Sequence, residues 1–218
     1  MSVESSELFR SLQALSGPFP PWDIHHLPER PGELFLDWLQ VAIKANVKEP
    51  HAMTISTVDQ DGYPDARVLI LKNVIDEAFY FASSSESRKG RQLEDNPHVA
   101  LTFYWPALGR QVRIRGTAAD MGNEAGADDF RKRSVGARAV AMTGRQSQEL
   151  ESEEVLDSSI EAQKERIQSD PDVVSPHWRL YAVNAREVEF WQGDSGRKHT
   201  RIRYELQYGQ WKLHRLWP

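Results

Sequence analysis

The sequence predicts an α+β fold in which antiparallel β-strands dominate and helices flank the sheet. Three observations lead to this prediction. About eight short segments have the alternating or aliphatic pattern of strands. Most connections between them are too short for parallel crossovers, and one long block, residues 123–169, is polar with a helical spacing of apolar residues. A sheet of this size can curl into a barrel and hide most strand edges.

The composition limits the classes of protein that this chain can be. Of its 218 residues, 39% are hydrophobic and 27% are charged, which suits one domain with a substantial core. The net charge of −5 argues against non-specific nucleic-acid binding, which needs a general positive field. There are no cysteines, and the histidines lack the spacing of metal ligands, so no metal site is expected. No signal peptide or long apolar span is visible, and we expect a cytoplasmic protein without membrane segments.

The first elements are an arm and a helix. Residues 1–30 form an N-terminal arm that becomes irregular at Pro18, Pro20 and Pro21, because each proline removes a backbone donor. We expect residues 31–218 to form a single domain. Its first helix is predicted over residues 32–46, where apolar side chains recur every three or four positions.

The strands follow in order, separated by turn signals. Residues 51–58 and 67–72 form a predicted hairpin around the turn Asp59–Gly62, and Asn96-Pro97 ends a short helix over residues 88–94. The other predicted strands cover residues 78–82, 99–105, 111–118, 178–183, 188–191, 201–206 and 211–216. The short connections predict an antiparallel meander, interrupted by the helical block.

The stretch Arg67–Lys72 has four aliphatic residues between two cations. Such a run predicts a strand that is covered on both faces, and the flanking charges suggest phosphate binding. The alternative is that the two charges only reach solvent. A second basic cluster, Ser87–Arg91, favours a local anion site in an otherwise acidic protein.

Eight short strings resemble one protein family in their order along the chain. They are Arg67–Lys72, Ser87–Lys89, Asn96-Pro97, Arg110–Gly116, Arg145–Ser147, Glu189–Gly193, Arg197–His199 and Trp211–Pro218. Together they resemble the pyridoxamine 5′-phosphate oxidase family of FMN-dependent flavoenzymes, over about residues 30–218. The resemblance implies a split β-barrel flanked by helices, working as a homodimer with FMN at the subunit interface.

The resemblance also assigns the cofactor residues. Arg67, Arg88 and Lys89 would hold the FMN phosphate, which suits a bidentate arginine and a point-charge lysine. The other residues implied to contact FMN are Val68, Leu69, Ile70, Leu71, Lys72, Ala82, Ser83, Gln111, Gln146, Ser147, Trp191 and Arg201.

On the substrate side, the resemblance implies that Lys72 and Arg133 bind the substrate phosphate. Arg197 and His199 would lie at the reacting ring as the catalytic residues. The implied reaction converts pyridoxine or pyridoxamine 5′-phosphate to pyridoxal 5′-phosphate, with O2 as electron acceptor and release of H2O2.

Two positions depart from the family pattern. Asp129 and Ala137 stand where a tyrosine and a serine usually help to bind the substrate phosphate, and a carboxylate there would repel a phosphate. These departures resemble the phenazine-biosynthesis branch of flavin oxidases. An oxidase of another reduced aromatic metabolite therefore remains an alternative, as does a split barrel that binds a flavin without catalysis.

Overall fold

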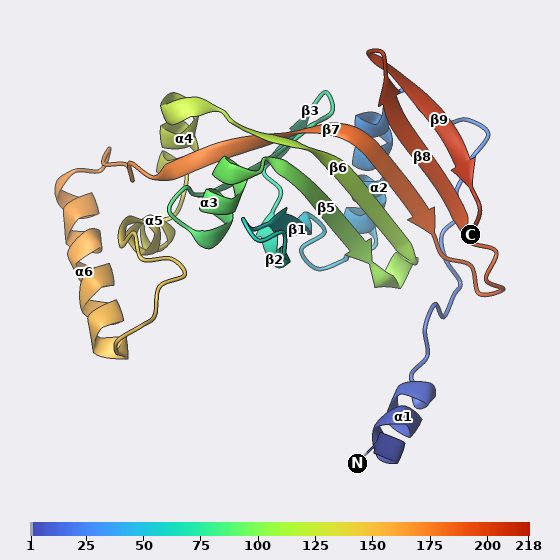
Figure 1. The fold of residues 1–218 in the computed structure, drawn as a ribbon, viewed down its shortest axis with the longest axis horizontal. Helices are drawn as coiled ribbons and strands as arrows, with labels where there is room; N and C mark the ends of the chain where they lie inside the picture. The colour runs from blue at the N-terminus through green and yellow to red at the C-terminus, as the bar shows by residue number, and fades with distance from the viewer. Residues whose placement is uncertain (1) are drawn as a thin grey trace. The chain divides into compact units, whose positions relative to one another are not determined.

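The computed structural model describes residues 2–218 and has the mixed α+β composition that the sequence predicts. The helices are α1 (Ser2–Ser11), α2 (Pro31–Lys44), α3 (Arg88–Asp95), α4 (Gly122–Arg131), α5 (Val135–Met142) and α6 (Glu153–Ser169), with a short 3-10 helix at Pro106–Leu108. The strands are β1 (Ala52–Val58), β2 (Pro64–Ile70), β3 (Asn73–Ile75), β4 (Ala78–Ser84), β5 (His98–Trp105), β6 (Arg110–Asp120), β7 (Trp178–Gln192), β8 (Thr200–Gln207) and β9 (Gln210–Leu216) (Figure 1). No helix among residues 2–218 is both long and apolar enough to span a bilayer.

The chain divides into two compact units. Of the described residues, unit 1 comprises 2–50, Thr102–Ile114 and Glu187–Pro218, and unit 2 comprises His51–Leu101 and Arg115–Arg186. The division cuts through β5, β6 and β7, each of which has residues in both units. The sequence-based division into an arm over residues 1–30 and one domain over residues 31–218 stays a prediction.

The order of the strands differs from a simple meander. Along the sheet it is β2-β1-β5-β6-β7-β4-β3, with β8 paired to β7 and β9 to β8. Strand β4 therefore pairs with β7, about a hundred residues later, and the predicted sequential order is wrong at this point. Helix α3 lies between β4 and β5, and this connection allows β5 to pair elsewhere.

Strand β7 is one continuous strand, where the sequence predicted two. It changes partner along its length: residues up to Asn184 pair with β4, and residues from Glu187 pair with β8. The polar residues in the middle of β7 suggested the end of one strand and the start of another. They lie instead where β7 exchanges its partner β4 for β8.

The predicted burial of β2 on both faces is also wrong. The side chains of β2 alternate between exposed and half-buried, with Val68 64% and Ile70 37% exposed. This strand stands at the end of the sheet order and pairs in register with β1, Ile55 opposite Arg67. One face of β2 is therefore open within one chain and the other is half-buried, whereas Leu71, just beyond the strand, is buried.

Helices α5 and α6 lie side by side in unit 2 (Figure 1). They share a small apolar cluster of Ala139, Ile167 and Val173, against which Met142 and Ile160 pack. The core of unit 1 is aromatic. Its rings come from α2 and from β5 and β7, with Phe35 4.8 Å from Phe103 and Trp38 5.2 Å from Phe190 between ring centroids.

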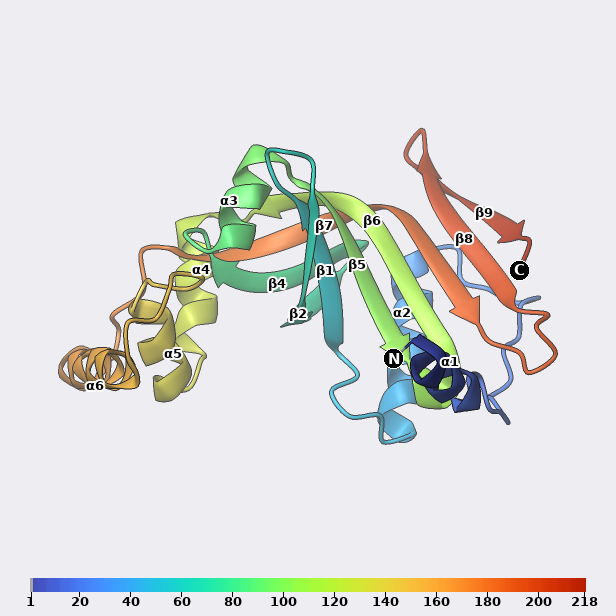
Figure 2. The same ribbon diagram turned by 60° about the horizontal axis from the view of Figure 1, so that its bottom comes forward.

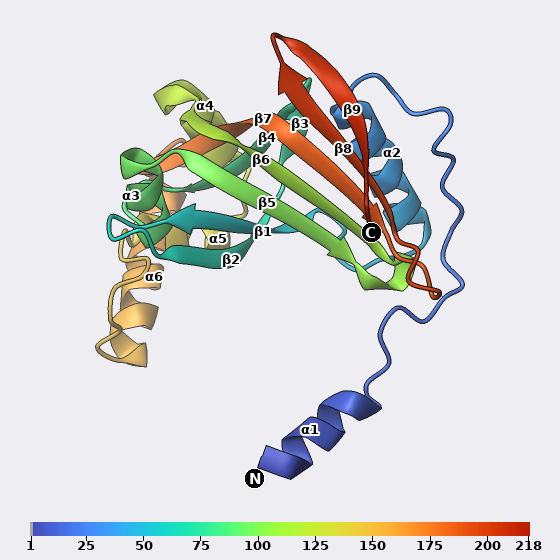
Figure 3. The ribbon, with the colours of Figure 1, turned by 45° about the vertical axis from the view of Figure 1, so that its right-hand side comes forward.

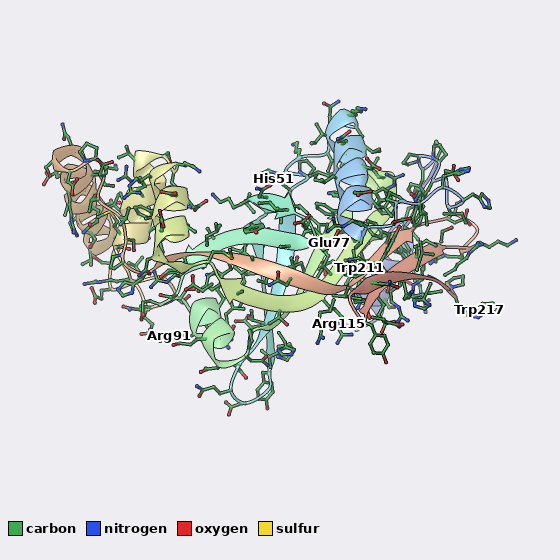
Figure 4. All side chains as sticks on the ribbon, turned by 90° about the horizontal axis from the view of Figure 1, so that it is seen from above. His51, Glu77, Arg91, Arg115, Trp211 and Trp217 are labelled. Atoms are coloured by element: carbon green, nitrogen blue, oxygen red, sulfur yellow. The ribbon has the colours of Figure 1, made fainter. Side chains whose placement is uncertain are left out.

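The C-terminal hairpin β8–β9 belongs to unit 1 (Figure 3). The Tyr204 hydroxyl of β8 donates a hydrogen bond to the Pro28 carbonyl at 2.8 Å, which ties part of the N-terminal arm to this hairpin. The arm also contains helix α1, which the sequence analysis did not predict. Beyond β9, Trp217 is 90% exposed (Figure 4).

Candidate functional site

The predicted anion site forms where α3 begins, beside the hairpin β1–β2 (Figure 2). Ser87 caps the helix, because its Oγ accepts the Gly90 N–H at 3.2 Å. A Cβ at Gly90 would collide with the carbonyl oxygens of Ser84 and Ser85, so glycine is required for this close approach. The helix N-terminus, whose free N–H groups favour anions, is thereby held against the end of β4.

Arg67 is held in place from three sides. Its Nη1 donates to Thr57 Oγ1 at 2.6 Å, its Nη2 donates to Gln92 Oε1 at 3.4 Å, and Asp65 forms an ion pair with it at 2.5 Å. Thr57 is fully buried and donates to Gln92 at 2.6 Å. The guanidinium therefore has a fixed orientation before any ligand is bound.

Thr57 and Gln92 were not singled out from the sequence. Two local signals were available: Thr57 occupies an inward position of alternating strand β1, and Gln92 follows Arg88 by four residues on α3. Only the packing of α3 against β1 brings the two side chains together.

Lys89 is a buried cation with neutral partners. The residue is 6% exposed, and its Nζ donates to Ser87 Oγ at 3.0 Å and to Gln146 Oε1 at 3.2 Å. The pKa of Lys89 is lowered to about 8, mainly by burial and also by the positive charge of Arg67, while Asp65 partly opposes the shift. No carboxylate is paired directly with Lys89 in the described part of the chain.

These residues fit a phosphate group. Two cations are held close together, and the buried Nε2 of Gln92 has no hydrogen-bond partner among residues 2–218. A phosphate would supply the missing negative charge and acceptors. Arg88 is more exposed, and its Nε lies 3.3 Å from Asp65.

A cavity of about 450 Å³ adjoins this cluster. Its walls include Arg88, Gln92, Gln146 and Ser147. The structure therefore brings polar side chains of α3 and of the loop between α5 and α6 to one place. Ser147 has a φ of +73°, in the left-handed region, within the loop between α5 and α6. The remaining lining residues are Asp59, Gln60, Asp61, Glu86, Arg91, Asp95 and Gln148. Arg91 projects from α3 (Figure 4).

The β4 residues predicted to contact the cofactor lie in unit 2 as well. Ser83 is buried, with its Oγ 3.5 Å from Ser87 Oγ, and Ala82 precedes it on β4. Val68, Leu69 and Ile70 lie on β2, where Val68 and Ile70 are exposed and Leu69 is half-buried.

A second cluster in unit 2 contains the predicted substrate residues Lys72 and Arg133. Lys72 Nζ lies 3.1 Å from Asp129, and the Arg133 guanidinium lies 4.1 Å above the Trp178 ring. Arg133 also lines a cavity of about 570 Å³ together with Ala137 and Trp178.

The other predicted residues lie in unit 1. Trp191, at the end of β7, has its ring 4.9 Å from that of His199. His199 Nδ1 accepts the Asp194 N–H at 3.1 Å, so the neutral ring carries its proton on Nε2. Arg197, with φ +66°, lies in the same turn, and its N–H donates to the Asp194 carbonyl at 3.0 Å. Gln111 lies half-buried on β6.

Arg201 is positioned by a buried carboxylate. Its Nε and Nη2 lie 3.0 Å and 2.9 Å from Glu189 Oε1, and Arg113 approaches the other oxygen at 3.7 Å. Glu189 is 6% exposed. The sequence analysis quoted Glu189 only as part of a string and gave it no role, although it lies two residues before Trp191 on the same face of β7.

The structure thus gathers the predicted residues into groups within each unit. Unit 2 holds the phosphate-type cluster and the Lys72 and Arg133 cluster, and unit 1 holds Gln111, Trp191, Arg197, His199 and Arg201. That all of them serve one site stays a prediction.

Comparison with known proteins gives consistent matches along the chain. Residues 39–167 match the family described as pyridoxamine 5′-phosphate oxidase, and residues 178–218 match a pyridoxine 5′-phosphate oxidase C-terminal dimerisation region. The chain is 40% identical over 196 residues to a pyridoxine/pyridoxamine 5′-phosphate oxidase of Salinibacter ruber, covering 88% of this chain and 91% of the relative. A protein of the same name from Bacteroides thetaiotaomicron is 42% identical over 193 residues, covering 88% and 91%.

A solved structure has the same fold. It is PhzG from Burkholderia lata 383 in complex with tetrahydrophenazine-1-carboxylic acid, with a TM-score of 0.86 and 29% identity over 93% of this chain and 100% of that one. The predicted fold class, an antiparallel split barrel flanked by helices, is confirmed.

Proposed function

The chain belongs to the pyridoxamine 5′-phosphate oxidase family, and from this premise we propose that it is an FMN-dependent oxidase that converts pyridoxine or pyridoxamine 5′-phosphate to pyridoxal 5′-phosphate. O2 is the electron acceptor and H2O2 the second product. The observation that carries the proposal is a pair of cations beside the N-terminus of α3, the buried Lys89 and the half-buried Arg67. Their arrangement suits the phosphate of FMN.

When bound, FMN would supply the redox chemistry, namely hydride acceptance from the substrate carbon and transfer of the electrons to O2. The chain's own residues bind and orient the reactants. Arg67, Arg88 and Lys89 hold the FMN phosphate, and Gln146 and Ser147 supply polar contacts from the cavity beside it. The remaining flavin contacts are assigned to Val68, Leu69, Ile70, Leu71, Lys72, Ala82, Ser83, Gln111, Trp191 and Arg201.

Arg197 and His199 act on the substrate. With Nδ1 engaged by a backbone N–H, neutral His199 offers its Nε2–H as a donor to a substrate oxygen or nitrogen. Arg197 offers a positive charge from the same turn, and Lys72 and Arg133 lie on the phosphate side of the substrate. Two copies of the chain form a homodimer with FMN at their interface, which the match of residues 178–218 to a dimerisation region supports.

The direct test is anaerobic mixing of the FMN-loaded protein with pyridoxine 5′-phosphate while the visible flavin absorbance is followed. We expect rapid bleaching that reverses when air is admitted. A protein that keeps its yellow colour with this substrate, yet is bleached by dithionite, would contradict the proposed substrate.

The pKa of Lys89 predicts a pH dependence of FMN affinity. In the free protein this pKa is about 8, so Lys89 loses its proton as the pH rises through that value. A bound phosphate favours the charged form and raises the pKa above its value in the free protein, so FMN binding weakens as the pH rises above about 8. We expect the Kd for FMN to increase about tenfold between pH 7 and pH 9, measured by quenching of flavin fluorescence. The Lys89→Met variant should bind FMN more weakly, with no such dependence; an equally steep increase in this variant would exclude Lys89 as the cause.

A second candidate function is an FMN-dependent oxidase of another reduced aromatic metabolite. The contact between Asp129 and Lys72 favours it, and so does the likeness to PhzG. In the anaerobic experiment this candidate predicts that the flavin stays oxidised with pyridoxine 5′-phosphate. A reduced tricyclic dihydro-aromatic compound should bleach it. A split barrel that binds flavin without catalysis predicts bleaching by neither compound.

A further inference from the structure

Asp129 lies between a cation and an N–H donor in unit 2. Its Oδ1 is 3.1 Å from Lys72 Nζ, and its Oδ2 accepts the indole N–H of Trp178 at 2.9 Å. The carboxylate is only 12% exposed. Both of its oxygens are thus engaged, and the charge of Lys72 has a built-in partner.

Arg133 is the second cation of this group. Its guanidinium stacks on Trp178 at 4.1 Å, and its Nη2 donates to the Ala137 carbonyl at 3.3 Å. Burial lowers the pKa of Arg133, and the negative charge of Asp129 acts in the opposite direction. Trp178 therefore connects the two ends of the group: it binds Asp129 through its N–H and Arg133 through its ring.

The charges of this group suit a ligand with little negative charge. Lys72 and Arg133 contribute two positive charges, and Asp129 removes one of them. A phosphate monoester carries nearly two negative charges at pH 7. It would meet only one uncompensated cation and would be repelled by Asp129 at close range.

The neighbouring cavity has mixed walls. Arg133, Ala137 and Trp178 line part of the roughly 570 Å³, and Ala137 has no side-chain group that could donate to a phosphate. Its apolar lining also includes Val140, Ala141, Leu150, Val155 and Leu156. A ring with an uncharged substituent suits these walls.

We propose that Asp129 is a specificity-determining residue, which cancels most of the contribution that a substrate phosphate makes to binding. Phosphorylated and phosphate-free forms of the substrate then bind with similar affinity. The inference rests on the proposed function, because the resemblance to the family is what assigns Lys72 and Arg133 to the substrate.

The test uses a ligand pair that differs only in the phosphate and cannot be oxidised: 4-deoxypyridoxine 5′-phosphate and 4-deoxypyridoxine. Their affinities for the FMN-loaded protein are measured by isothermal titration calorimetry. In the wild type we expect the two Kd values to agree within about tenfold. Asp129→Asn keeps an oxygen that can accept the Trp178 N–H, and should tighten binding of the phosphorylated ligand about tenfold or more while leaving the other unchanged.

Two further variants make the result specific. Asp128→Asn removes the same charge one residue earlier on α4, where Asp128 is exposed and paired with Arg131, and should change neither Kd. Lys72→Met should weaken binding of the phosphorylated ligand in the wild type, because it leaves the Asp129 carboxylate without its partner cation. In the Asp129→Asn background it should cancel the gain, because it removes the Lys72 charge that the first substitution made available.

The inference would be overturned if the wild type bound the phosphorylated ligand more than about a hundredfold more tightly than the other and Asp129→Asn showed the same preference. If pyridoxine 5′-phosphate nevertheless bleached the flavin, the proposed function would still stand. If Asp129→Asn bound neither ligand, and pyridoxine 5′-phosphate did not bleach the flavin of the wild type, both the inference and the proposed function would be overturned.

Discussion

Replacing Arg67 by alanine is expected to produce a protein that no longer retains FMN. The guanidinium is held by Thr57 and Gln92 in a part-buried site, where it has one orientation available for a phosphate. Removing one partner of such a charge pair costs about 2 to 5 kcal/mol, so the Kd for FMN should rise by at least about thirtyfold. The measurement is a titration of the apoprotein with FMN, followed by quenching of flavin fluorescence.

The matched control is Arg166→Ala, which removes the same charge from an exposed position of α6 in the same unit. It should leave the Kd for FMN unchanged. Arg67→Lys should be intermediate, because lysine restores the charge but not the bidentate geometry. Thermal unfolding of the apoproteins separates loss of binding from loss of fold. An Arg67→Ala protein that is folded and binds FMN as tightly as the wild type would remove the basis of the proposed phosphate site.

Replacing His199 by alanine is expected to slow flavin reduction without releasing the flavin. His199 is oriented by the Asp194 N–H and by the ring of Trp191, so its Nε2–H has a defined direction. Loss of one positioned donor or proton-transfer group lowers a rate by about a hundredfold to ten-thousandfold. We therefore expect the rate of anaerobic bleaching by pyridoxine 5′-phosphate to fall at least about a hundredfold, with the Kd for FMN nearly unchanged.

His98→Ala provides the comparison, because His98 is an exposed residue at the start of β5. Its bleaching rate should equal that of the wild type. A His199→Ala protein with the wild-type rate would exclude a role in the chemical step. A parallel loss of FMN would instead indicate that the residue supports Trp191 and the flavin pocket.

The sequence by itself determined the local elements of this protein. The alternation of β1, the turn at Asp59–Gly62 with Gly62 at φ +86°, and the Ser87 cap of α3 all depend on neighbours within a few residues. The basic strings along Arg67–Lys72 and Ser87–Arg91 belong to the same class of information. They predicted an anion-binding site, because a cluster of several cations in a chain with a net negative charge indicates local binding of an anion.

Only the tertiary structure decided which distant residues meet. Asp129 and Lys72 are far apart in sequence, as are Lys89 and Gln146, and their contacts depend on how helices and strands pack rather than on any local pattern. The pairing of β4 with β7 and the open face of β2 have the same origin. A strand's pattern shows which side chains share a face, but its partner and its place at the edge follow from the packing of the whole sheet. For this reason the sequence predicted that Asp129 would repel a phosphate, whereas the structure showed that its carboxylate already neutralises Lys72.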